Sequence, residues 1–264
     1  MTGQSFETIF VEQEGPLARL WLSRPEVHNA FNAAMIRELR EALRSLGGDR
    51  SVRAVILSGR EASFCAGADL NWMREIIRYS YEQNLQESLD LAGLLYDLYT
   101  LSKPTIARVK GAAIGGGAGL VAACDIVVAD AEAKFGLSEV KLGLVPACIA
   151  PYVLRKMGER WTRQYFLTGE RFGAARAREV GLVNILAGPG ELEAKVEELA
   201  GMLITSGPEA LANVKVLLTR VPGMSLDEAQ RFTAEMIARL RTSSEGQEGM
   251  AAFLEKRRPP WAGG

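Results

Sequence analysis

Five glycines within nine residues, set between two apolar runs, limit the possible folds of this chain most strongly. They are Gly111, Gly115, Gly116, Gly117 and Gly119. The run before them, residues 105–109, and the run after them, residues 125–129, are typical of buried strands. Strands that alternate with short helices indicate βαβ units in a mostly parallel sheet. Glycines at such a turn either let another molecule approach the backbone or only allow tight packing of strand and helix, and the pattern admits both.

The remaining patterns predict an α/β part followed by a helical part. Residues 6–11 and 17–22 flank a Glu-Gly-Pro turn and predict a hairpin. Asn32 is a helix cap before an apolar face, and residues 54–57 form another short apolar run. Helices are expected around 151–157, 161–167, 192–203, 209–218, 226–240 and 247–257. We therefore expect an α/β core over residues 1–190 and a helical region over 191–264.

Composition excludes several classes of protein. Lys and Arg number 31 and Asp and Glu 32, so the net charge of −1 argues against a nucleic-acid partner. The three cysteines are far apart, which excludes a disulfide scaffold and suits a reducing cytosol, so a cytoplasmic location is expected. His28 is the single histidine, and a multi-histidine metal site is impossible. The longest apolar stretch, residues 112–124, is too short for a membrane span.

Two further segments contain residues suited to chemistry. The small residues of SFCAGADL, residues 63–70, follow a strand and either approach a ligand or form a turn before a helix cap. Glu139 lies in the apolar segment FGLSE, where burial would raise its pKa and suit it to proton transfer. A surface ion pair with Lys141 is the alternative. Cys65 and His28 are weaker candidates, and Asp125 is expected to cap or pair.

Taken together, these segments resemble one known family. In order they read SFCAGADL, KPTIARVKGAAIGGGAGLVAACDIVVA, FGLSEVKLGLVP, LTGERFGAARAREVGLVN and EGMAAFLEKRRP. This series is similar to the crotonase superfamily of enoyl-CoA hydratases and isomerases. Within it, GGGAGLVAACD with FGLSEVKLGLVPACIAPYV and YFLTGERF is most similar to methylglutaconyl-CoA hydratases, which act in leucine degradation on a branched, carboxylated acyl-CoA.

The resemblance implies a fold and an activity. The fold would be a crotonase-type α/β spiral, a ββα core with a helical C-terminal region that builds trimers or dimers of trimers. The activity would be reversible hydration of 3-methylglutaconyl-CoA, with the acyl-CoA as substrate and with no metal or redox cofactor. Another enoyl-CoA hydratase or a Δ-enoyl-CoA isomerase is the alternative of the same class. A non-catalytic or RNA-binding protein is the alternative of another class, which the net charge disfavours.

The resemblance also implies roles for single residues. The backbone N–H groups of Ala68 and Gly116 would form an oxyanion hole, and Glu139 would be a catalytic acid–base. Contacts to the acyl-CoA would come from residues along the chain: Val27, Ala66, Ala68, Asp69, Leu70, Asn71, Gly116 and Lys256. Lys256 would reach a CoA phosphate, often across a subunit boundary.

One position departs from the pattern of the hydratases. Their second catalytic glutamate falls on Gly119 of this chain. The departure raises the prospect of an isomerase, and a glycine there is expected to leave room for a branched acyl group. Lys141 and Arg155, which lie near Glu139 and Pro146 in sequence, are candidates to receive the distal carboxylate of the substrate.

Overall fold

The computed structural model describes residues 6–262, and its larger sheet has six strands. The strand order is β1-β2-β3-β4-β6-β9, in which only the β1–β2 hairpin is antiparallel. The strands are β1 (Ile9–Glu14), β2 (Leu17–Leu22), β3 (Ala54–Gly59), β4 (Thr105–Val109), β6 (Ile126–Asp130) and β9 (Ile185–Ala187). A smaller sheet pairs β5 (Ala112–Ile114) with β7 (Lys134–Gly136) and β7 with β8 (Arg171–Gly173).

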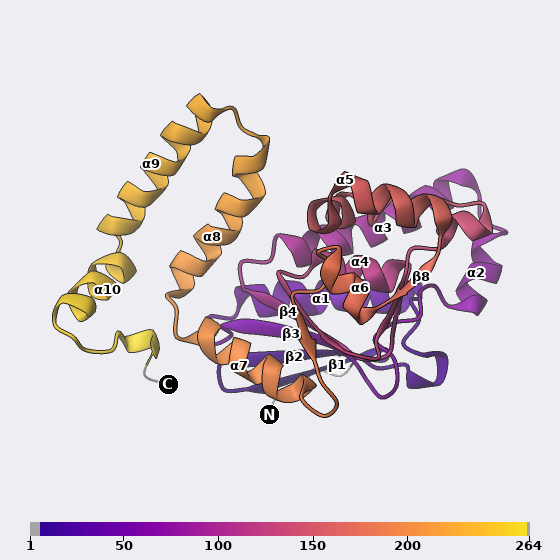
Figure 1. The fold of residues 1–264 in the computed structure, drawn as a ribbon, viewed down its shortest axis with the longest axis horizontal. Coiled ribbons are helices and arrows are strands. Elements are labelled where there is room, and N and C mark those ends of the chain that lie inside the picture. The colour runs from indigo at the N-terminus through magenta and orange to yellow at the C-terminus, as the bar shows by residue number, and fades with distance from the viewer. Residues whose placement is uncertain (1–5, 263–264) are drawn as a thin grey trace.

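Helices cover both faces of the larger sheet (Figure 1). Those before residue 180 are α1 (Ala33–Gly48), α2 (Leu70–Ile76), α3 (Tyr81–Tyr99), α4 (Gly116–Ala123), α5 (Ala150–Thr168) and α6 (Ala174–Glu179). The opposite face is covered by α7 (Leu192–Ile204), whose Leu192, Val196 and Ala200 pack with Ile56 and Ile106. Successive strand residues point to opposite faces, so the central strands β3, β4 and β6 supply both cores.

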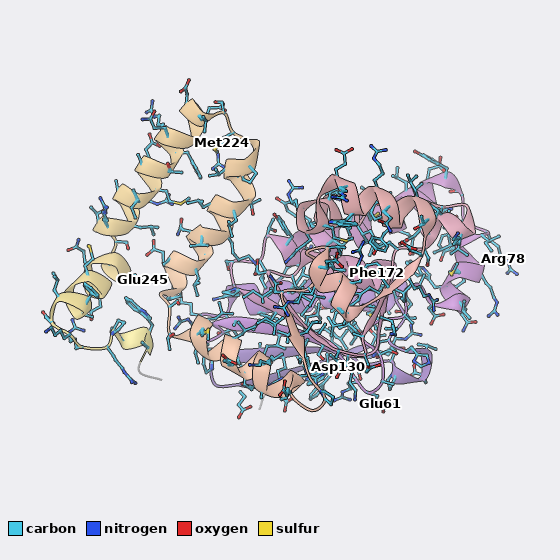
Figure 2. All side chains as sticks on the ribbon, in the orientation of Figure 1. Glu61, Arg78, Asp130, Phe172, Met224 and Glu245 are labelled. Carbon is cyan, nitrogen blue, oxygen red and sulfur yellow. The ribbon has the colours of Figure 1, made fainter. Side chains whose placement is uncertain are left out.

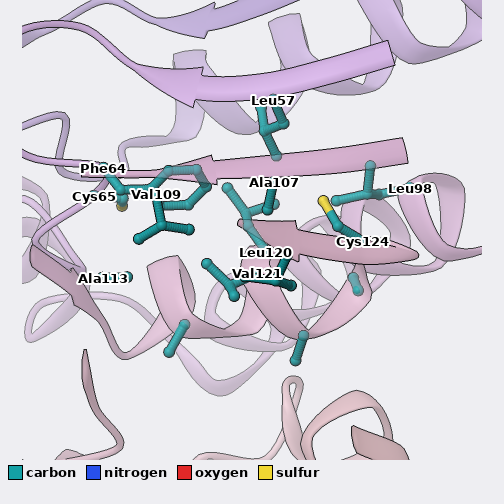
Figure 3. Packing of buried hydrophobic residues seen from close by; sticks show 14 of the residues in the cluster. Leu57, Phe64, Cys65, Leu98, Ala107, Val109, Ala113, Leu120, Val121 and Cys124 are labelled. Atoms are coloured by element: carbon teal, nitrogen blue, oxygen red, sulfur yellow. The ribbon is translucent and has the colours of Figure 1, made fainter. Parts of the chain in front are cut away.

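The helix α4 is buried on nearly all sides. Its Leu120 and Val121 pack near Leu57, Ala107 and Val109 of the sheet (Figure 3). A short helix with no polar side chain is stable only in such surroundings. The sheet and α3 therefore fix the start of α4 in space.

Three helices extend away from this core (Figure 1): α8 (Pro208–Arg220), α9 (Leu226–Thr242) and α10 (Ser244–Leu254). Figure 2 marks Glu245 at the start of α10, where its carboxylate accepts hydrogen bonds of 2.8 Å from the amides of Glu209 and Ala210. That carboxylate holds the start of α10 to the start of α8. Large apolar side chains remain exposed here, among them Leu226 at 89% and Phe253 at 83%.

The predicted fold class is confirmed, and several elements match the predicted bounds. The strands at 17–22 and 105–109 are found as expected, and the Asn32 side chain caps α1 by accepting from the Met35 amide at 2.8 Å. The helix predicted at 192–203 is α7, which packs on the sheet, and the following helix α8 still contacts the core through the Lys215–Asp125 ion pair. The division at residue 190 stays a prediction. No helix within residues 6–262 combines the length and the apolarity needed to cross a membrane.

Other elements differ from the predictions. The glycine segment is not one loop: β5 comes first, Gly115 makes the turn with φ 54°, and α4 begins at Gly116. The two helices expected around 151–167 form α5, with a kink at Gly158. The strands β7, β8 and β9 are three residues long, too short to show a period of two in the sequence.

Candidate active site

The first part of the site is the segment 65–69, which pairs with backbone on both sides. The amide of Phe31 donates to Gly67 O at 2.7 Å, and the amide of Asp69 donates to Phe31 O at 2.8 Å. Phe31 thus bonds to both neighbours of Ala68, as in a parallel pair, and the Ala68 amide points the other way. That amide finds no hydrogen-bond acceptor among residues 6–262. It is therefore available to a ligand.

The second part is the first turn of α4. Gly116 opens the helix, and the first amides of a helix have no partner within it. These amides and the helix dipole favour negative charge at this end. A Cβ at Gly116 would lie 2.9 Å from Phe31 Cε2. Phe31 therefore bonds to one amide loop and contacts the other, and it fixes Ala68 and Gly116 relative to each other.

The constraint on Gly116 is steric and not conformational. The positive φ lies one residue earlier, at Gly115 with 54°. At Gly116 the ring of Phe31 leaves no space for a side chain. The two residues are 85 positions apart, so no local sequence pattern could reveal this contact.

Glu139 follows the smaller sheet in the chain and lies next to the start of α4. It opens the short helix η2 (Glu139–Leu142), three residues after β7 ends at Gly136. The amide of Gly115 donates to Gly136 O at 2.8 Å, which joins the two segments. A Cβ on Gly115 would lie 3.2 Å from Glu139 Oε1. The carboxylate is thus next to the turn that precedes the Gly116 amide.

The surroundings of Glu139 favour its protonated form. Burial raises the pKa of this carboxyl above its ordinary value, against a backbone hydrogen bond that lowers it. The Oε2 atom is buried and has no hydrogen-bond partner among the described residues. A carboxylate that is desolvated and unpaired binds a proton readily. The structure shows no ion pair between Glu139 and Lys141, whose side chain instead approaches Gly169.

The space beside Gly119 is filled. A Cβ at this position would lie 2.2 Å from Ile149 Cγ2 and 2.9 Å from Ile149 Cβ, with Leu95 Cδ2 at 3.7 Å behind. The expectation that Gly119 leaves room for a branched acyl group is therefore wrong, because Ile149 occupies that room. Sequence reasoning missed Ile149, since it lies 30 residues away and in an unremarkable apolar stretch.

The other predicted ligand contacts divide into two groups. Val27 ends the short helix η1 (Pro25–Val27), and the next residue, His28, accepts a 3.0 Å hydrogen bond from the Ala66 amide, so these segments lie side by side. Leu70 and Asn71 are exposed at the start of α2. Their roles toward the acyl-CoA stay predictions.

Asp69 has a structural function in this arrangement. Its Oδ1 caps α2 by accepting from the amide of Asn71 at 2.7 Å, and its Oδ2 accepts from Arg24 Nη2 at 2.7 Å. Because both oxygens are engaged and the residue is buried, its side chain holds the loop and does not face a ligand. Arg24, which also donates to Ala30 O at 2.7 Å, was not predicted.

Lys256 and Arg155 lie away from this site. Lys256 follows α10, the last of the three helices that extend away from the core (Figure 1). Arg155 lines a separate pocket with Cys124, Asp125 and Lys215, at the far end of α4, which is eight residues or about 12 Å long. Arg155 therefore does not lie beside Glu139, although the two are close in sequence, and it is not placed to receive the distal carboxylate of the substrate there.

The weaker candidates have structural explanations. Burial raises the pKa of Cys65 to about 12, so its thiol is no nucleophile at neutral pH. His28 Nδ1 lies 3.1 Å from Ser63 Oγ in a loop. Asp125 Oδ2 accepts from Lys215 Nζ at 2.6 Å and from the Thr105 amide at 2.8 Å, as a pairing residue would. Within the described residues, no three His, Cys, Asp or Glu side chains gather as metal ligands would.

Comparison with known proteins identifies relatives over nearly the whole chain. A putative enoyl-CoA hydratase of Thermus thermophilus is 40% identical over 247 residues, which are 94% of this chain and 98% of that protein. A crotonyl-CoA hydratase of Syntrophomonas wolfei is 32% identical, with 96% of this chain and 97% of that protein covered. Identity of this level over nearly the whole of both chains shows that the proteins share a family.

Solved structures agree with these relatives. An enoyl-CoA hydratase from Shewanella pealeana superposes with a TM-score of 0.94 at 41% identity, over 97% of this chain and 96% of that one. AtuE of Pseudomonas aeruginosa also has a TM-score of 0.94, at 36% identity, over 97% of this chain and all of that one. Residues 12–264 match the family described as enoyl-CoA hydratase/isomerase. On its sequence, its fold and the geometry at Ala68, Gly116 and Glu139, the chain belongs to the enoyl-CoA hydratase/isomerase family.

Proposed function

We propose that this enzyme, a hydro-lyase of the enoyl-CoA hydratase type, reversibly hydrates 3-methylglutaconyl-CoA to 3-hydroxy-3-methylglutaryl-CoA, a reaction of leucine degradation. One observation supports the chemistry above all. The carboxylate of Glu139, whose buried Oε2 has no hydrogen-bond partner among residues 6–262, lies at the turn that presents the Gly116 amide, and Phe31 joins that turn to the Ala68 amide. A proton-transfer group thus adjoins two donors for an oxyanion.

The two amides would stabilise the enolate. With the thioester oxygen between Ala68 N and Gly116 N, charge that develops on that oxygen meets fixed donors. One such donor contributes roughly 2.7–4 kcal/mol to the transition state. The start of α4 adds the positive end of its dipole. The reaction needs no metal and no redox cofactor, because the CoA thioester is the substrate itself.

Glu139 would transfer the proton in both directions. In hydration, its ionised form takes a proton from water while the oxygen adds to the β-carbon, and the same proton goes to the carbon next to the thioester. In dehydration, the order is reversed. The carboxylate begins and ends ionised, so atoms and charge balance with one enzymic acid–base.

A carboxylated substrate suits a site with a single acidic group. A second carboxylate at position 119 would repel the carboxylate of the acyl group, since like charges about 4 Å apart cost roughly 4 kcal/mol at an effective dielectric of 20. The substrate's own carboxylate can instead hold the water. The absence of an acidic side chain at Gly119 therefore favours a carboxylated substrate over a plain enoyl-CoA.

Assembly would complete the CoA site. Helices α8 to α10 present exposed apolar side chains away from the core, including Phe253 and Leu254 next to Lys256. A homo-oligomer, either a trimer or a dimer of trimers, would cover these side chains. It would also bring Lys256 to the CoA phosphate of a neighbouring subunit, because Lys256 is far from Glu139 in its own chain.

A panel of enoyl-CoA thioesters tests the proposal. Loss of the conjugated absorbance is followed with straight, branched and carboxylated acyl groups at equal concentration. The proposal predicts the highest kcat/KM for 3-methylglutaconyl-CoA. Faster hydration of crotonyl-CoA would contradict it.

Isomerisation is the second candidate, and Gly119 favours it, because a single carboxylate suffices to move a double bond. Product analysis of a β,γ-enoyl-CoA decides between the two. A migrated double bond with no hydroxyacyl product would identify an isomerase.

A further inference from the structure

Two side chains lie against two glycines at the start of α4, Gly115 before the helix and Gly119 within it. Gly115 and Gly119 are one helical turn apart, and the amide of Gly119 donates to Gly115 O at 3.0 Å. Glu139 Oε1 lies against the first glycine and Ile149 Cγ2 against the second. The position one turn along from the acid–base is thus filled by an aliphatic side chain.

Ile149 is held firmly in this place. It is 2% exposed, and its carbonyl accepts 3.1 Å hydrogen bonds from the amides of Tyr152 and Val153 at the start of α5. Its two atoms nearest to a Cβ at Gly119 are Cγ2 and Cβ, which stand close to the backbone. Such atoms cannot move aside as the far end of a flexible side chain can. Leu95 closes the space behind.

We propose that Ile149 is a specificity-determining residue: by filling the space at Gly119 it excludes a second acidic side chain and leaves Glu139 as the sole proton-transfer group. The site then acts best on enoyl-CoA thioesters that bring their own anionic group. This inference rests on the proposed role of Glu139. If position 119 only lacked a side chain, a larger residue could be placed there without loss of stability. We expect instead that a larger residue at position 119 destabilises the protein unless Ile149 is also shortened.

Thermal unfolding of four variants tests the steric part, at one protomer concentration. Gly119→Ala lowers Tm by roughly 3–10 °C, because overpacking outweighs the ordinary gain of alanine in a helix. Gly201→Ala in α7 is the matched control: nothing lies within 4 Å of its Cβ, and Tm stays or rises. Ile149→Ala lowers Tm by leaving a cavity. The Gly119→Ala/Ile149→Ala protein loses clearly less than the sum of the two.

The outcome of this cycle is independent of any substrate. Additive losses, or a Gly119→Ala protein as stable as the wild type, overturn the inference even where the enzyme hydrates 3-methylglutaconyl-CoA. A coupled cycle in an enzyme that hydrates no enoyl-CoA leaves the packing unit intact and refutes the proposed function instead.

Activity of two acidic variants tests the specificity part. Gly119→Glu alone unfolds at a lower temperature and gains no hydration of crotonyl-CoA. Gly119→Glu/Ile149→Ala regains stability, hydrates crotonyl-CoA about tenfold faster than the wild type or better, and shows a second ionisation in its pH–rate profile. A folded double variant with an unchanged crotonyl-CoA rate and a single ionisation overturns the role of Ile149.

Discussion

Replacing Glu139 by Gln removes the proton-transfer group with little change in shape. General acid–base help is worth about 10²–10⁴ in rate. At about 1.36 kcal/mol per decade, this is roughly 2.7–5.4 kcal/mol of transition-state stabilisation. The upper part of the range is expected, because Ile149 closes position 119 to a second carboxylate. Hydration of 3-methylglutaconyl-CoA should therefore lose at least about a thousandfold in kcat.

The same variant should not lose stability. Glu139 is half-buried, and its Oε2 atom has no partner within residues 6–262, so a neutral amide is easier to bury than the carboxylate. The pKa of Glu139 is raised in the folded state. Folding therefore binds protons, and the carboxyl destabilises the fold increasingly as pH rises from the unfolded pKa through the folded one. Glu139→Gln should match or exceed the wild-type Tm at pH 7, and the difference should vanish below about pH 4.

The pH dependence of the wild type follows from the same shift. The ionised carboxylate is the active form, so kcat/KM should rise with pH through a midpoint above the ordinary glutamate value. Stopped assays across the acidic range measure this rise, and thermal unfolding supplies the stability of both proteins. Near-normal turnover by a folded Glu139→Gln protein would show that Glu139 is not the proton-transfer group.

Three other changes test separate parts of the structure. Gly116→Ala should lower kcat about 10²–10³-fold, since its Cβ meets Phe31 at 2.9 Å and displaces the oxyanion amide; unchanged steady-state kinetics would count against that amide. Lys256→Ala should raise KM for the CoA thioester a few-fold but not for a pantetheine thioester, and the effect should disappear in high salt. Asp125→Ala should lower the free energy of unfolding by about 2–4 kcal/mol in urea titrations, because Lys215 loses its 2.6 Å partner, and should leave kcat alone.

Local patterns predicted the elements that local chemistry determines. Asn32 was expected to cap a helix, and its side chain accepts from the amide of Met35, three residues ahead. The strand at 105–109 was expected to be buried, and four of its five residues are, because helices cover both faces of the sheet. The family resemblance then placed Glu139 near the glycine segment, and the structure brings them together.

Contacts between distant segments could not be predicted in this way. Phe31 and Ile149 are ordinary apolar residues in sequence, and their importance arises only from the glycines that they touch. The room expected at Gly119 was wrong for the same reason, since a missing side chain leaves space only where no neighbour fills it. Arg155 shows the converse, because closeness along the chain placed it near Glu139 while α5 carries it to the far end of α4.

Addition of water with one enzymic carboxylate can be followed directly. Turnover of 3-methylglutaconyl-CoA in water labelled with heavy oxygen is analysed by mass spectrometry of the thioester products. We expect one heavy oxygen atom in 3-hydroxy-3-methylglutaryl-CoA from the wild type, and almost none from Glu139→Gln in the same time. Consumption of substrate without incorporation of heavy oxygen, or equal incorporation by the two proteins, would contradict this mechanism.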